Sequence, residues 1–442
     1  MHPRTTHTAP PGGAEGLLTE HYAGLLGEAR ERTLWLVEPV SREDLERVHS
    51  TLLSPLVWDL GHIAAFEDLW LCQQAGGLDL LRPELADVYD ATITPRAQRG
   101  ELEFLGHADA LAYMDEVRAR ALGVLASADL SERSDPLNAR GFVWDMLVQH
   151  EHQHNETMLQ TLSLAAPGVY EPERRALPGP PPGERGPDMV RVDGGACLIG
   201  FRGDGFAYDN ERPCHEVEVP GFEIDRLPVT CGDFIDFIAD GGYFRREWWS
   251  DEGWAWRQLE GVERPHYWTA DGEVRRFERT LPLDPELPVM HVSWHEAEAY
   301  ARSRGKRLPS EIEWEKAASW DEAAGRQLRH PWGDEPWSER LANLDQTAFG
   351  PARAGAYPAG ASPYGVLGMA GDAWEWTASD FTGYPGFEPF PYSEYSELFF
   401  GSEYRVLRGG SWATRPSVAR ASFRNWDYPV RRQIFSGFRC AA

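Results

Sequence analysis

The sequence predicts a multidomain protein, in which an N-terminal all-α four-helix bundle is followed by a C-terminal α+β domain heavy in loops. Three observations support this. A chain of 442 residues is too long for one ordinary hydrophobic core. Apolar residues recur at helical spacing through roughly the first 165 positions. From about Met189, short β-like runs, many glycines and prolines and most of the tryptophans replace that pattern.

The N-terminal half divides into a tail and a bundle. Residues 1–13 are rich in His, Thr, Pro and Gly and lack the apolar core of a signal peptide, so we expect a disordered tail. Residues 14–165 form the expected bundle. Its four helices are predicted near 17–37, from 54 to about 69, over 107–127, and around the pair His150 and His154. Ser54 is the predicted N-cap of the second helix, with Pro55 in its first position.

A linker and a second domain follow. Residues 166–188 contain a Pro/Gly run at 177–183 that cannot continue a helix or pair as a central strand, which predicts a linker. Residues 189–442 form the expected α+β domain. Capping boxes at 293–296 and 310–313 predict two short helices, and the segments 372–377 and 405–412 are typical of strands broken by tight turns.

Histidines at helical spacing predict a metal site in the bundle. His150 and His154 lie four residues apart on the apolar stripe of their helix and therefore share one face. His62 follows the stripe of the second helix and can supply a third imidazole. His152 and Glu156 are turned away from this face. The alternative is that all three are hydrogen-bonded core histidines, but two on one stripe would each need a buried partner.

Composition limits the partners and the compartment. The formal net charge of −27 argues against a nucleic-acid partner, and no apolar run is long enough to cross a bilayer. The five cysteines are scattered, without CxxC spacing, which argues against a disulfide framework and favours a reducing cytoplasm. We expect small-molecule substrates, no membrane, and a monomer or weak oligomer.

Two groups of arginines are candidates for binding an anionic small molecule. Either group can instead be solvated arginines paired with nearby acids. The groups are Arg96 with Arg99, and Arg424 with Arg431 and Arg432.

Five stretches of the second half carry a family resemblance: 287–294, 307–314, 374–376, 408–412 and 437–440. As a set they resemble the formylglycine-generating-enzyme (sulfatase-modifying factor) domain, a variant of the C-type lectin fold. The N-terminal part, with His62 and the H-x-x-x-H-x-E run, resembles a DinB-type metal-binding bundle. The two in this order resemble the iron-dependent sulfoxide synthases of ergothioneine biosynthesis, the hercynine oxygenases. The resemblance implies Fe(II) as cofactor, O2 as co-substrate, and allows a structural calcium ion in the C-terminal domain.

The segment 423–435 looks like the actinobacterial-type enzymes that use γ-glutamylcysteine. The implied reaction is O2-dependent C–S bond formation between hercynine (Nα-trimethylhistidine) and γ-glutamylcysteine, which gives the γ-glutamyl hercynylcysteine sulfoxide.

The resemblance also implies roles for single residues. The matching iron ligands are His62, His150 and His154. Tyr392 matches the catalytic proton donor and Tyr395 its partner tyrosine. Residues that match positions around hercynine are Gln153, Asn425 and Trp426. Residues that match positions holding γ-glutamylcysteine are Arg96, Arg99, Asp427 and Arg431.

Other functions stay open at this point. The same three histidines suit a DinB-type divalent-metal thiol transferase or hydrolase that works without O2. The C-terminal domain can be a lectin-like binding module supported by the bundle. The sulfur donor can be free cysteine or a seleno-sugar. Formylglycine generation fits less well, because it needs two cysteines near the C-terminal end and only Cys440 lies there.

Overall fold

The computed structural model describes residues 14–182 and 186–442, which form two compact units divided between His154 and Asn155. The predicted combination of a helical N-terminal part and a C-terminal part of mixed helices and strands is confirmed. The predicted disordered tail, residues 1–13, lies outside the described residues.

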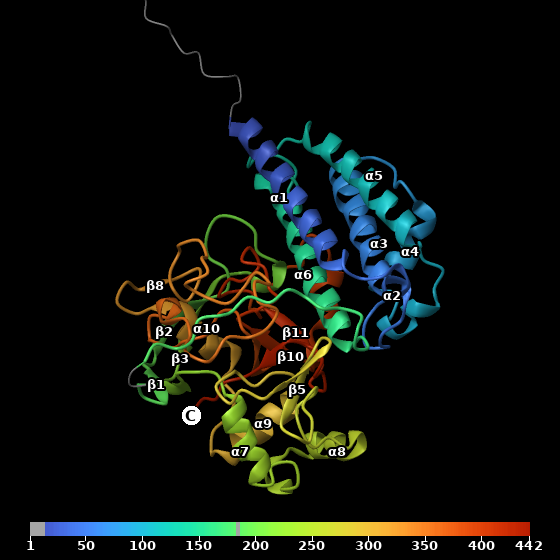
Figure 1. Ribbon diagram of the computed structural model, residues 1–442. Helices are drawn as coiled ribbons and strands as arrows, with labels where there is room; N and C mark the ends of the chain where they lie inside the picture. The colour runs from blue at the N-terminus through green and yellow to red at the C-terminus, as the bar shows by residue number, and fades with distance from the viewer. Residues whose placement is uncertain (1–13, 183–185) are drawn as a thin grey trace, which may run out of the picture. The chain divides into compact units, whose positions relative to one another are not determined.

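The first unit is helical, and Figure 1 shows α3 and α5 running side by side. Its elements are α1 (Ala14–Val37), α2 (Arg42–Glu46), α3 (Leu56–Glu67), a π-helical continuation (Asp68–Ala75), α4 (Ala86–Tyr89), α5 (His107–Leu125) and α6 (Phe142–Leu164), with short 3-10 turns at Pro83–Leu85, Arg96–Glu101 and Ala139–Gly141. Helix α6 continues past the division between the units. The four long predicted helices correspond to α1, α3, α5 and α6.

A buried ion network joins these four helices. Arg30 of α1 donates to Glu67 of α3 at 2.8 Å and to Glu151 of α6 at 2.9 Å. Arg118 of α5 pairs with the same two carboxylates, at 2.6 Å to Glu67 and 3.3 Å to Glu151. Because two cations face two buried anions, the charges compensate each other away from water. The network therefore holds α6 in the orientation in which Glu151, the residue after His150, faces α1, α3 and α5.

The start of α3 differs from the prediction. Helix α3 begins at Leu56 with Pro55 as its N-cap, and no side chain caps it. The hydroxyl of Ser54 instead accepts a hydrogen bond from Arg99 Nη1 at 2.8 Å. A guanidinium from the 3-10 turn 45 residues away therefore takes the capping oxygen, which the local sequence could not show.

The segment after α6 has no regular structure in its described part. Helix α6 ends at Leu164 and the first strand begins at Met189. The predicted domain limits at 165 and 188 remain predictions, and so does the linker between them.

The second unit is built on small sheets, antiparallel except where β12 pairs parallel with β9, and on short helices (Figure 1). Its strands are β1 (Met189–Val192), β2 (Gly195–Ile199), β3 (His215–Val219), β4 (Phe222–Asp225), β5 (Glu273–Arg276), β6 (Arg279–Pro282), β7 (Trp320–Asp321), β8 (Arg326–Gln327), β9 (Trp374–Phe381), β10 (Gly401–Arg408), β11 (Asn425–Asp427) and β12 (Ser436–Gly437). Its helices are α7 (Cys231–Ala239), α8 (Asp251–Glu260), α9 (Trp294–Ser303) and α10 (Glu311–Ser319). The largest sheet has the order β11-β10-β9-β12.

The sequence signals in this unit produce the expected elements. Both capping boxes are present, with Ser293 and Glu296 at the start of α9 and Ser310 and Glu313 at the start of α10. The segments predicted as broken strands become β9 and β10, which pair antiparallel.

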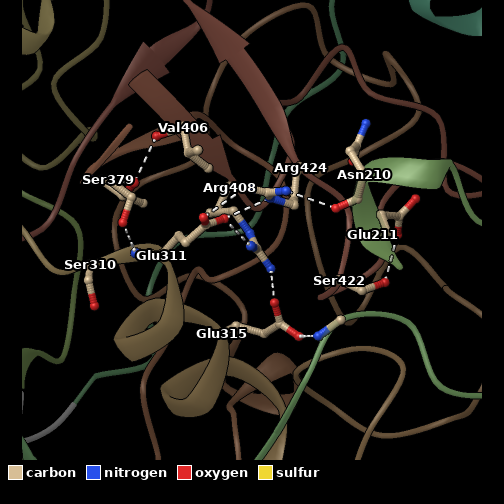
Figure 2. A network of polar contacts seen from close by, with 12 residues as sticks. Asn210, Glu211, Ser310, Glu311, Glu315, Ser379, Val406, Arg408, Ser422 and Arg424 are labelled. Atoms are coloured by element: carbon tan, nitrogen blue, oxygen red, sulfur yellow. Dashed lines mark hydrogen bonds and ion pairs between the residues drawn. The ribbon is translucent and has the colours of Figure 1, made fainter. Parts of the chain in front are cut away.

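Buried ion pairs fix the strands of the large sheet to α10, as Figure 2 shows. Arg408 of β10 donates to Glu315 at 2.5 Å and to Glu311 at 3.2 Å. Arg424, just before β11, makes two hydrogen bonds of 2.8 Å to Glu311. The charge of Arg424 is therefore neutralised inside the core. Arg424 forms no site for an anionic ligand.

Among the described residues, no helix combines the length and the apolar character needed to cross a membrane.

Candidate metal centre

Helices α3 and α6 bring the three predicted histidines together. The ligand atoms of His62, His150 and His154 all lie within 4.8 Å of one another, the one such group of three or more found in the part of the chain that the structure describes. The Nε2 atoms of His62 and His150 are 3.2 Å apart. Two nitrogens bound at right angles to an ion about 2.1 Å away would be about 3 Å apart. The spacing therefore fits a shared metal ion.

Hydrogen bonds on the far side of two rings orient them. His62 Nδ1 donates to the backbone oxygen of Tyr89 at 2.6 Å. His154 Nδ1 lies 3.2 Å from a carboxylate oxygen of Asp59, a fully buried residue of α3. A ring that donates from Nδ1 carries its lone pair on Nε2, the state that a metal requires. This pattern of imidazoles held by a carbonyl and a carboxylate is the usual surrounding of a metal-binding histidine.

Aromatic rings form the walls of the centre. Trp58 stacks on His62 with ring centroids 5.0 Å apart, and Phe66 stacks on His150 at 3.9 Å. The Nδ1 atom of His150 has no hydrogen-bond partner among the described residues, and the ring is positioned by its contacts with Phe66, His62 and His154.

Burial keeps two of the rings neutral. Removal from water lowers the pKa of His62 and of His150 well below the usual histidine value, and the neighbouring His154 adds to both shifts. A neutral imidazole is the form that binds a metal. The donor set, its geometry and its protonation therefore fit one divalent transition-metal ion.

The two polar neighbours on α6 lie away from the centre, as predicted. His152 Nε2 is 3.6 Å from Glu28 of α1. Glu156 is buried, and its carboxylate accepts hydrogen bonds from Trp374, Ser411 and Thr414, which belong with it to the second unit.

Three further predicted residues belong to the first unit. Gln153 is half-buried on α6 beside His154, and Arg96 is half-buried. Arg99 is buried and donates to Ser54 Oγ and to backbone oxygens of Thr94 and Ala91, while its guanidinium stacks on Trp58 at 3.9 Å. No carboxylate among the described residues forms an ion pair with it, and burial lowers the pKa of Arg99 to about 10.

The predicted residues of the second unit lie in one aromatic and charged cluster. Asn425, Trp426 and Asp427 form β11, and Asp427 pairs with Arg431 at 3.5 Å. The Tyr395 ring stands perpendicular to that of Trp426 at 5.8 Å between ring centroids.

Tyr392 joins this cluster through Tyr395, with the two ring centroids 6.2 Å apart. Phe381 covers one face of Trp426 at 4.1 Å. The motifs at 392–395 and 425–431, far apart in sequence, therefore meet.

Sequence reasoning missed two groups of the centre. Asp59 could have been found, because a carboxylate three residues before His62 on a mostly apolar helix is unusual. The Tyr89 carbonyl could not, because a backbone oxygen leaves no signature in the sequence.

The cysteine near the C-terminal end lies in the core. Cys440 is fully buried, and burial raises the pKa of its thiol well above the usual value.

Family models cover both parts of the chain. Residues 25–158 match the DinB superfamily, and residues 174–442 match the sulfatase-modifying factor enzyme 1-like domain.

Curated relatives match nearly the whole chain. A hercynine oxygenase of Mycolicibacterium thermoresistibile is 46% identical over 438 residues, which cover 96% of this chain and 96% of that protein. The hercynine oxygenase of Mycolicibacterium smegmatis is 47% identical, over 96% of this chain and 98% of the relative. That of Mycobacterium tuberculosis is 46% identical over the same shares. Both domain types are present, in the order that the resemblance implied. The chain therefore belongs to the hercynine oxygenase family and is an oxygenase.

Proposed function

We propose that this oxygenase couples hercynine to γ-glutamylcysteine in ergothioneine biosynthesis, with O2 as oxidant. The imidazole C–H and the thiol S–H bonds break, while a C–S and an S–O bond form. One oxygen atom of O2 enters the sulfoxide and the other leaves as water, so O2 takes up four electrons. The product is the γ-glutamyl hercynylcysteine sulfoxide.

The convergence of His62, His150 and His154 on one point is the observation that carries the proposal. These imidazoles would hold Fe(II). Bound there, iron supplies the open coordination positions and the redox chemistry that O2 activation requires. The aromatic walls, the buried Trp58 and the half-buried Phe66, would keep bulk water from the ligands.

The hercynine contacts follow from its charges. Its trimethylammonium group cannot donate hydrogen bonds and binds best against an aromatic face. Trp426, with Tyr395 perpendicular to it, offers such a surface. Asn425 would hold the neighbouring carboxylate, and Gln153 would hydrogen-bond the imidazole.

The γ-glutamylcysteine contacts need cations and one anion, because the dipeptide carries two carboxylates and one ammonium group. Arg99 has no carboxylate partner among the described residues, and burial depresses its pKa. An anionic ligand would compensate this buried charge. Arg96 and Arg431 would bind carboxylates, and Asp427 would bind the ammonium group.

Tyr392 would act as the proton donor. Its phenol would deliver a proton or hydrogen bond to the reduced oxygen species and so favour C–S coupling over simple thiol oxidation. Tyr395 would hold Tyr392 in place through the ring contact between them.

We also propose the cytoplasm as the compartment. All five cysteines are free, as in a reducing environment.

One experiment tests the proposal. Protein loaded with Fe(II) without O2 is mixed with hercynine and either γ-glutamylcysteine or cysteine, then exposed to O2, and the products are identified by mass spectrometry. We expect the sulfoxide of the dipeptide, and little product from cysteine. Turnover that needs no O2, or that runs on zinc instead of iron, would reject the proposal.

A further inference from the structure

Glu156 is a buried carboxylate to which the proposed reaction assigns no role. It lies two residues after the ligand His154 in α6 and is 7% exposed. Its Oε1 accepts hydrogen bonds of 2.7 Å from Trp374 Nε1 and from Ser411 Oγ, and its Oε2 accepts one of 2.7 Å from Thr414 Oγ1. The donors come from two separate motifs of the second unit, at the start of β9 and after β10.

The donors are themselves fixed. The hydroxyl of Ser411 accepts from the backbone N–H of Ala413 at 3.1 Å, and that of Thr414 accepts from the N–H of Ser411 at 2.9 Å. Each hydroxyl oxygen is thus occupied on one side, so its hydrogen is free to point at Glu156. The carboxylate therefore sits in a preformed cradle of three donors.

This carboxylate is not itself a metal ligand. Both of its oxygens already accept hydrogen bonds, and a residue two positions after His154 lies on the opposite side of the helix. In the part of the chain that the structure describes, the buried Glu156 has no ion pair with an arginine, lysine or histidine. Burying a carboxylate without a cationic partner costs free energy, and packing alone does not explain why this one is buried.

We propose that Glu156 is a positioning residue of the metal centre: its clamp by Trp374, Ser411 and Thr414 fixes the turn of α6 that carries His154. Successive residues of a helix are about 100° apart around its axis, so Glu156 and His154 lie on opposite sides of the same turn. A rotation of that turn about the axis would move the imidazole away from the ion. Metal ligands work only within about 0.5 Å of their correct places. The inference rests on the metal centre of the proposed function but not on its chemistry.

The test removes one hydroxyl of the cradle without touching a ligand. Thr414→Val deletes the donor to Oε2, and Thr414→Ser keeps it. Thr161→Val is the matched control, because Thr161 is a buried threonine of α6 whose hydroxyl donates within the helix, to the Thr157 oxygen at 3.3 Å.

The readouts are the Kd for Fe(II) and for Co(II), measured without O2, the Co(II) absorption spectrum, and the melting temperature of the metal-free protein. We expect Thr414→Val to weaken metal binding about 10-fold and to change the Co(II) spectrum. Thr414→Ser should restore both, and Thr161→Val should leave both unchanged.

A second pair of variants asks whether the two groups act together. Glu156→Gln should weaken binding to a similar degree, and the double variant with Thr414→Val should be no worse than Glu156→Gln alone. If the melting temperature of the metal-free variants falls while their Kd stays within twofold of the parent's, Glu156 is structural only and the inference is wrong. If metal binding shifts as expected but no C–S product forms in any protein, the inference stands and the proposed reaction fails. A parent that binds neither ion would overturn both.

Discussion

Asp59 is a buried carboxylate that contacts His154 without belonging to the set of metal-binding residues. Its oxygen accepts from His154 Nδ1 at 3.2 Å and makes that ring a better donor to a metal. We expect Asp59→Asn to weaken Fe(II) binding about tenfold, because the amide oxygen still accepts the hydrogen bond but carries no charge. Anaerobic titration measures this, with the exposed Asp115→Asn as control. Equal affinities for the two variants would contradict this role.

Tyr392 decides the product in the proposed reaction. We expect Tyr392→Phe to shift the product from the sulfoxide toward the sulfinate of the thiol substrate, because the variant lacks the proton donor. The ratio of the two products by mass spectrometry is the measurement, and Tyr404→Phe, which alters another tyrosine of the same unit, is the control. An unchanged ratio would remove the assigned role.

His295 links stability to pH. Both of its ring nitrogens lack hydrogen-bond partners among the described residues, and burial lowers its pKa to about 4, helped by the charge of Arg405. The unfolded chain titrates near 6.5, so it binds more protons than the folded chain below that value, and stability is lost as the pH falls from 6.5 toward 4.

Replacing His295 by phenylalanine removes this loss. The quantity compared is the free energy of unfolding of His295→Phe minus that of the parent. We expect this difference to be larger at pH 5 than at pH 7.5, by on the order of 1–2 kcal/mol. Urea denaturation at the two pH values measures it. A difference that is independent of pH would show that the histidine titrates normally.

Helix α3 couples a small residue to the metal centre. A Cβ at Gly61 would lie 2.2 Å from the ring of the buried Tyr89, whose backbone oxygen holds His62. Alanine favours a helix by about 1 kcal/mol over glycine, but overpacking a core costs about 1–3 kcal/mol. We therefore expect Gly61→Ala to lower stability and weaken metal binding. Gly123→Ala on α5, where nothing lies within 4 Å of the added atom, should do neither.

The elements were largely predictable where local signals decide them. The helical stripes of α1, α3, α5 and α6 and the capping boxes of α9 and α10 depend on residues close in sequence. The cap of α3 was not predictable, because Arg99 draws Ser54 Oγ away from the helix end. The π-helical continuation 68–75 has no sequence signal that we can identify.

At the level of the whole chain, the order of the two domain types was readable from motifs, and so were the three imidazoles. The point at which α6 is divided between the two units could not be predicted from the sequence. The helix itself runs unbroken through His154 and Glu156, whereas the structure assigns the two residues to different units. Contacts between residues more than 200 positions apart, such as Glu156 with Trp374, decide that division.

Fe(II) binding by the intact chain tests the central claim most directly. Anaerobic titration of the parent and of His62→Ala, His150→Ala and His154→Ala, each checked for folding by circular dichroism, gives the stoichiometry and the affinity. The account predicts one Fe(II) per chain in the parent and loss of stoichiometric binding in each folded variant. A folded variant that binds one Fe(II) with the affinity of the parent would contradict it.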